Sequence, residues 1–178
     1  MSYGIISLLI LPILLVANGF GDSFVHYSNQ DEPDSLIGKM FLDVREPDVD
    51  GEYHMLSEYA GKGKWVLVDF WASWCGPCKR EMPNVVAAYK KFHNKGFEIV
   101  GFSFDANKAE WIDAIKSWDM PWVHLSDLKA WNTKAGQVYD IQGIPDNILI
   151  NPEGIIVARD LRGEQLDETL SKYLNQGE

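Results

Sequence analysis

Cys75 and Cys78 are the only two cysteines among 178 residues, and Gly76 and Pro77 separate them. A bridge across two intervening residues closes almost no loop, so it would be a poor structural staple. A zinc site needs four ligands and usually a second Cys/His pair, whereas the four histidines are scattered along the chain. A fragment of a metal site or a chance pair remains an alternative, but this spacing favours thiol–disulfide exchange. We expect neither a metal nor a cofactor.

The sequence around the pair predicts that Cys75 lies where a strand ends and a helix begins. Residues 65–71 are apolar apart from Asp69, which is typical of a strand buried on both faces. Apolar residues at helical spacing follow from Pro77. The N-terminus of a helix stabilises a thiolate and lowers the thiol pKa. We therefore expect Cys75 to be the more acidic thiol, open to solvent, and Cys78, one turn later, to attack the mixed disulfide formed at Cys75.

The rest of the chain alternates between strand and helix patterns. The predicted strands are 41–44, 99–104, 123–125, 147–150 and 155–158, and the last two flank a strong hairpin signal, NPEG. Helical segments are predicted at 56–59, 111–118, 128–138 and 166–174, and an acidic turn at 46–52. Strands joined by helices and closed by a hairpin indicate an α/β fold with a mixed central sheet flanked by helices.

The run FWASWCGPCK at 70–79 resembles the active-site motif of the thioredoxin superfamily. The Glu81-Met82-Pro83 that follows resembles the exported TlpA/ResA-like branch, whose domain is of the AhpC/TSA type, and this likeness extends over roughly residues 36–176. The resemblance implies a thioredoxin fold with an N-terminal extension and an insert after the second core strand. It also implies dithiol–disulfide exchange, with Cys75 and Cys78 as a redox-active disulfide, in an extracytoplasmic compartment.

The same resemblance suggests how substrate is held. In relatives, the position of Pro145 is a cis-proline beside the cysteines, and the backbone of the preceding residue, here Ile144, pairs with substrate. Trp74 is expected to form a flat apolar contact surface for polypeptides, and Gly76 and Pro77 to take part in substrate binding. The tryptophans in the later helices and the insert, including Trp131, are assigned to packing.

Two carboxyl groups are candidates for the base that accepts the proton of Cys78. Asp69 interrupts a buried strand, where a carboxyl group tends to stay protonated near neutral pH, and it matches the buried aspartate of thioredoxin. Glu81 matches a glutamate that many TlpA/ResA-like chains carry just after the motif. The sequence leaves both open, and the branch resemblance slightly favours Glu81.

The N-terminal part differs in composition from the rest. Residues 3–17 are apolar, which suggests a signal peptide or membrane anchor within 1–21, although the usual basic residues before it are missing. A buried first helix is the alternative. Residues 22–35 are polar and predicted to be a linker, and 36–178 to be the thioredoxin-like domain. The net charge of −10 disfavours nucleic acid and anionic membrane surfaces as partners.

These features favour a monomeric enzyme that reduces disulfides of exported proteins and draws electrons from an upstream thiol donor, with a membrane-bound carrier as one candidate. Gly-Pro between the cysteines resembles thioredoxin, which is a reducing couple. The alternatives are a disulfide-forming oxidant, a thiol peroxidase, and a non-catalytic binding module with the same fold.

Overall fold

The computed structural model describes residues 36–175. The expected signal or anchor segment and the expected linker therefore lie outside the described residues. Within 36–175, no helix has the length and apolar character that crossing a bilayer requires.

A five-stranded mixed sheet forms the centre of the domain, in the order β5-β4-β3-β6-β7. The central strand β3 (Trp65–Trp71) pairs in parallel with β4 (Phe97–Ser103), which pairs in parallel with β5 (Val123–Leu125). On its other side β3 pairs antiparallel with β6 (Asp146–Ile150), and β6 with β7 (Ile156–Arg159). The predicted α/β class and the strands in these five regions are confirmed, with ends shifted by up to two residues.

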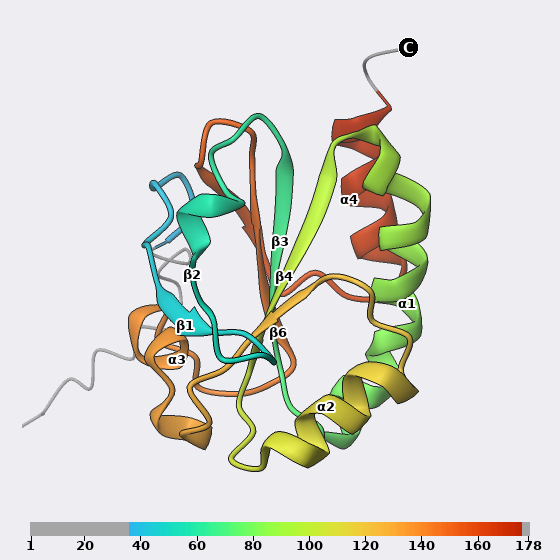
Figure 1. Ribbon diagram of the computed structural model, residues 1–178. Helices are drawn as coiled ribbons and strands as arrows, with labels where there is room; N and C mark the ends of the chain where they lie inside the picture. Colours follow the sequence, from blue (N-terminus) through green and yellow to red (C-terminus); the bar gives the residue numbers. More distant parts are fainter. Residues whose placement is uncertain (1–35, 176–178) are drawn as a thin grey trace, which may run out of the picture. The chain divides into compact units, whose positions relative to one another are not determined.

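Both faces of this sheet are covered (Figure 1). Helices α1 (Gly76–Phe92) and α4 (Glu164–Leu174) lie together on one side. Helix α3 (Lys134–Val138) and a small hairpin of β1 (Arg45–Pro47) and β2 (Tyr53–Met55) lie on the other. Coverage on both faces explains why β3 is almost entirely apolar.

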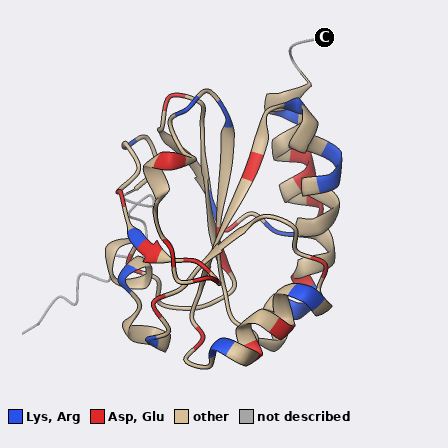
Figure 2. Cartoon of the chain, viewed as in Figure 1, with Lys and Arg blue, Asp and Glu red and all other residues tan. Residues whose placement is uncertain are grey.

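The remaining helical segments are α2 (Lys108–Ser117) and three short 3-10 helices, at Leu56–Glu58, His93–Lys95 and Ala130–Asn132. Figure 2 shows acidic and basic residues interspersed along α1 and α4. One such pair joins the two helices, because Lys91 Nζ lies 2.7 Å from Asp167 Oδ1. This pair is half exposed, so it adds little to stability compared with the apolar surface that the helices bury.

Two predictions about the elements are wrong, and one buried carboxylate explains both. The first strand is Arg45–Pro47 rather than 41–44, in a region predicted as a turn. Glu46 in this strand is buried, and its Oε1 accepts hydrogen bonds of 2.8 Å from Thr133 Oγ1 and from the Ala135 amide. Thr133 has extended rather than helical ψ, so the helix expected over 128–138 is split into Ala130–Asn132 and Lys134–Val138.

Candidate functional site

Cys75 and Cys78 are joined in a disulfide at the start of α1. Cys75 is the N-cap residue of this helix, and its Sγ accepts a 3.1 Å hydrogen bond from the backbone N–H of Cys78. Pro77 occupies the first turn, where the missing N–H of proline leaves no partner unsatisfied. The predicted position of Cys75 at a helix N-terminus is confirmed. The same N–H and the helix dipole would stabilise the thiolate once the bond is reduced.

The expectation that Cys75 is open to solvent is wrong. Cys75 is 4% exposed and Cys78 is 1% exposed. Cys75 is thus the more exposed of the two, as predicted, but both are buried. The segment before β6 covers the first sulfur, because the carbonyl oxygen of Ile144 lies 3.7 Å from Cys75 Sγ. Cys75 Sγ is in the disulfide and has no S–H to donate, so this is a close contact and not a hydrogen bond. A substrate must therefore fit closely around a nearly covered sulfur.

The peptide bond between Ile144 and Pro145 is cis, as the resemblance implied. Ile144 is half-buried and Pro145 is buried, and both lie beside Cys75. Gly76 and Pro77 are exposed, and Pro77 lines one open cavity together with Ile144 and Pro145. The residues expected to contact substrate are thus brought together at one end of the sheet around the two sulfurs.

Trp74 and Trp131 form an exposed aromatic pair next to the disulfide. Their exposed fractions are 51% and 49%, and their ring centroids are 6.1 Å apart. The indole Nε1 of Trp74 donates a 3.3 Å hydrogen bond to the carbonyl oxygen of Phe104, and the ring of Phe104 meets Trp131 edge-on at 5.2 Å. Trp131 was assigned to packing, but half of its side chain is exposed beside Trp74. The sequence did not indicate this contact, because the spacing of Trp131 fits a helix that packs on the core.

Asp105 is a site residue that sequence reasoning missed. It is fully buried, and its carboxylate accepts hydrogen bonds from the Ser73 amide at 3.0 Å, the Ser73 hydroxyl at 2.5 Å and the Ser103 hydroxyl at 2.7 Å. These bonds fix the turn between β3 and Trp74. An aspartate directly after the apolar strand at 99–104 was the available signal, because parallel strands end at the same edge of a sheet.

Asp69 lies within β3 and is 3% exposed. Its Oδ2 is buried and has no hydrogen-bond partner within residues 36–175. Burial is the main cause that raises the pKa of this carboxyl group to about 7; the negative charges of Glu81 and Asp146 contribute to the rise, and Arg162 opposes it. Asp69 can therefore exchange a proton near neutral pH.

Glu81 has different surroundings. It is half-buried on α1, and both of its carboxylate oxygens have partners. Oε1 accepts a 2.7 Å hydrogen bond from the Gly163 amide, and Oε2 accepts one of 3.2 Å from the Asn84 side chain. Because Gly163 immediately precedes α4, Glu81 ties the start of that helix to α1.

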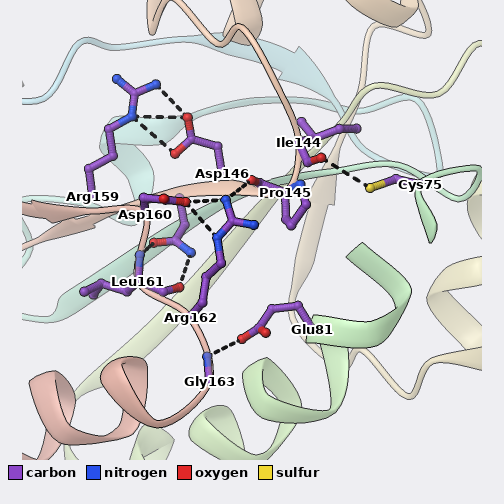
Figure 3. A network of polar contacts seen from close by, with 11 residues as sticks. Cys75, Glu81, Ile144, Pro145, Asp146, Arg159, Asp160, Leu161, Arg162 and Gly163 are labelled. Atoms are coloured by element: carbon purple, nitrogen blue, oxygen red, sulfur yellow. Dashed lines mark hydrogen bonds and ion pairs between the residues drawn. The ribbon is translucent and has the colours of Figure 1, made fainter. Parts of the chain in front are cut away.

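An open cavity of about 480 Å³ adjoins the cis-proline segment, Ile144–Pro145. Pro77, Ile144 and Pro145 line it together with charged side chains of Asp146, Arg159, Asp160 and Arg162. Figure 3 shows Arg162 pointing toward Pro145, to whose carbonyl oxygen it donates a 2.5 Å hydrogen bond. No local pattern in the sequence marks Arg162, because 82 residues separate it from the end of the motif at Lys79.

Known proteins resemble this chain in sequence and in structure. The model of the AhpC/TSA family matches residues 37–159. The thiol-disulfide oxidoreductase ResA of Bacillus cereus is 30% identical over 171 residues, which cover 94% of this chain and 92% of that protein.

Two solved structures agree with these matches. The thioredoxin domain of a thiol-disulfide oxidoreductase from Bacteroides vulgatus is 36% identical with a TM-score of 0.71, and the match covers 78% of this chain and 98% of that domain. A thiol-disulfide oxidoreductase from Bacteroides fragilis is 31% identical with a TM-score of 0.71, over 76% of this chain and 100% of that one. The thioredoxin fold expected from the motif is confirmed.

Proposed function

The chain belongs to the AhpC/TSA family and is a thiol–disulfide oxidoreductase, and from this premise we propose that it reduces disulfides of polypeptide substrates. The observation that carries the proposal is the position of Cys75 as the N-cap of α1, with the Cys78 amide donating to its sulfur. This geometry favours the thiolate at Cys75 over the thiolate at Cys78. Gly-Pro between the cysteines supports the reducing direction, because the thioredoxin couple it resembles is reducing.

The reaction has two displacement steps at sulfur. The Cys75 thiolate attacks one sulfur of the substrate disulfide, which forms a mixed disulfide and releases the first substrate thiolate. The Cys78 thiol then loses its proton and attacks Cys75 Sγ, which releases the second substrate thiolate and forms the Cys75–Cys78 bond. Two electrons pass to the substrate, and the bond described here is the oxidised state. An upstream dithiol donor must return two electrons to close the cycle.

We assign the proton transfer at Cys78 to Asp69 rather than to Glu81, which the sequence slightly favoured. Asp69 has a buried oxygen without a partner among the described residues and a pKa raised to about 7 by burial. Both oxygens of Glu81 are engaged by Gly163 and Asn84. An acid with a pKa near the working pH is well suited to accept a proton and to return it.

The surface around the sulfur suits an extended polypeptide. The backbone of Ile144, next to cis-Pro145, lies closest to Cys75 and would pair with the substrate main chain. Gly76 and Pro77 directly follow Cys75 and are exposed, so a substrate can reach them. Trp74 and Trp131 together offer an apolar contact for a side chain near the substrate cysteine. Because Cys75 is nearly covered, such contacts would govern which disulfides react.

The proposal includes an extracytoplasmic location, supported by the apolar segment 3–17 before the domain. There the enzyme would act as a monomer, on disulfides of exported proteins. Its electron donor would be a thiol protein, and a membrane-bound carrier is a candidate. Residues 1–21 would direct export or anchor the chain, and 22–35 would link them to the domain.

Equilibration of the protein with glutathione redox buffers tests the direction of electron flow. We expect a reduction potential nearer to the about −270 mV of a thioredoxin-type couple than to the about −120 mV of a strong oxidant. The reduced protein should also reduce a disulfide-containing polypeptide, and Cys75→Ser should abolish this activity. A potential near the oxidising value would overturn the reductive proposal, and activity that survives in Cys75→Ser would remove Cys75 from the reaction.

A further inference from the structure

The turn between β7 and α4 contacts two parts of the site at once. Arg162 in this turn donates a 2.5 Å hydrogen bond from Nη2 to the carbonyl oxygen of Pro145. The amide of the next residue, Gly163, donates a 2.7 Å hydrogen bond to Glu81 Oε1. Figure 3 shows the two contacts side by side, one directed toward the cis-proline segment and one toward α1.

The backbone of this turn is fixed to the sheet. Asn147, a buried residue of β6, accepts a 3.0 Å hydrogen bond from the Leu161 amide and donates one of 2.8 Å to the Leu161 carbonyl oxygen. The Asp160 amide adds a 2.9 Å bond to the Asn147 carbonyl oxygen. Three hydrogen bonds to one buried residue hold the turn at a set distance from the strand that follows Pro145.

The guanidinium group of Arg162 is oriented within the turn. Its Nε donates a 2.8 Å hydrogen bond to Asp160 Oδ1, and its Nη2 also contacts that oxygen. Asp160 has left-handed backbone with φ of 57°, a conformation that aspartate tolerates better than most residues. A guanidinium held by a carboxylate keeps its remaining donors in a fixed direction, which suits a bond to a single carbonyl oxygen.

We propose that Arg162 is a positioning residue for disulfide exchange, which holds the Ile144–Pro145 segment against Cys75 through the Pro145 carbonyl oxygen. This inference rests on the proposed reduction of polypeptides. Hydrogen bonds from a charged donor are stronger than neutral ones, so loss of this bond should let the segment move away from the sulfur. A polypeptide that pairs with Ile144 would bind less well, whereas a small disulfide that does not use the segment would be little affected.

The charge of Arg162 has a second, separable effect. Arg162 lowers the pKa of Asp69, while Glu81 on α1 and Asp146 on β6 raise it. Removal of the positive charge should therefore move the acid limb of the pH profile for the second displacement to higher pH. Lysine in place of Arg162 keeps the charge but lacks the planar fork that reaches Asp160 and Pro145 together.

The test compares Arg162→Gln, Arg162→Lys and the control Arg45→Gln, whose guanidinium lies over the Tyr53 ring in the β1–β2 hairpin. Each variant is assayed with a disulfide-containing polypeptide and with 5,5′-dithiobis(2-nitrobenzoate). We expect Arg162→Gln to raise KM for the polypeptide about tenfold, equivalent to about 1.4 kcal/mol. The rate with the small disulfide should change less than about twofold. The acid limb of the pH profile for the second displacement should move to higher pH. Arg162→Lys should raise KM without the pH shift, and Arg45→Gln should change neither.

The possible outcomes distinguish a failure of the positioning role of Arg162 from a failure of the proposed polypeptide reduction. A wild-type KM for the polypeptide in both Arg162 variants would overturn the positioning role while leaving the reductase intact. Equal slowing with both substrates, together with a lower melting temperature in both variants, would show a structural role and also overturn it. Absence of polypeptide reduction by the wild-type protein would overturn the proposed function and the inference with it.

Discussion

Asp69 and Glu81, the two candidate bases, differ in what their oxygens contact. The buried Oδ2 of Asp69 has no partner within residues 36–175, while Glu81 accepts hydrogen bonds from Gly163 and Asn84. We expect Asp69→Asn to slow the attack of Cys78 on the mixed disulfide about 100-fold, the lower end of what a positioned proton acceptor contributes, and to leave the first attack unchanged. Rapid-quench measurement of the mixed disulfide checks both steps.

Glu81→Gln is the matched control, because it removes the other carboxylate while keeping an oxygen that can accept from Gly163. We expect it to slow the second displacement much less than Asp69→Asn does. If Glu81→Gln instead had the larger effect on that step, the assignment made from the sequence would be right and the one made from the structure wrong.

The raised pKa of Asp69 also makes a prediction about stability. A carboxyl group whose pKa is higher in the folded state binds protons more tightly there. Its contribution to the free energy of unfolding is therefore most favourable at low pH. That contribution falls as pH rises from about 4, the usual carboxyl value, through the folded pKa of about 7. Asp69→Asn should therefore raise the melting temperature at pH 8, and the gain should shrink toward pH 4. A difference independent of pH, measured by thermal unfolding, would contradict the raised pKa.

At the scale of elements, Glu46 joins the β1–β2 hairpin to the insert that carries Trp131. Its Oε1 accepts from Thr133 and from the Ala135 amide, and burial raises its pKa to about 7. Glu46→Ala would leave these buried donors unsatisfied, so we expect a loss of about 1–3 kcal/mol in the free energy of unfolding and faster hydrogen exchange at Ala135. Glu52→Ala, in the same hairpin but exposed, should change neither. Unchanged exchange at Ala135 in Glu46→Ala would show that other contacts hold the insert.

The sequence predicted the elements with long apolar patterns and missed those held by polar contacts. Strand β3 is a continuous apolar run and helix α1 has apolar residues at helical spacing, and both patterns can be read locally. Strand β1 is short and contains Glu46 and Pro47, and it forms because the insert supplies donors to a buried carboxylate. Its partners lie more than 80 residues away, so no local pattern could show it.

The same contrast holds within the site. Cys75, Cys78 and Pro145 could be found because each belongs to a recognisable local motif. Arg162, Trp131 and Asp105 could not be assigned a role in this way, because each reaches the site from a distant segment through the fold. The burial of Cys75 also depends on such a contact, with Ile144.

At the scale of the whole molecule, the helix N-terminus, the cis-proline segment and the aromatic pair surround a single reactive sulfur, Cys75. Nothing in this arrangement gives Cys78, which is 1% exposed, direct access to a large partner. Exchange with a polypeptide should therefore begin at Cys75 alone.

Capture of the mixed disulfide tests this claim most directly. The full-length protein with Cys78→Ser, reduced and mixed with a disulfide-containing polypeptide, should accumulate a covalent 1:1 complex that a reductant dissolves and that peptide mapping places at Cys75. The Cys75→Ser protein, treated in the same way, should form no such complex. A stable complex through Cys78 in Cys75→Ser, with none in Cys78→Ser, would contradict the assignment of the attacking sulfur.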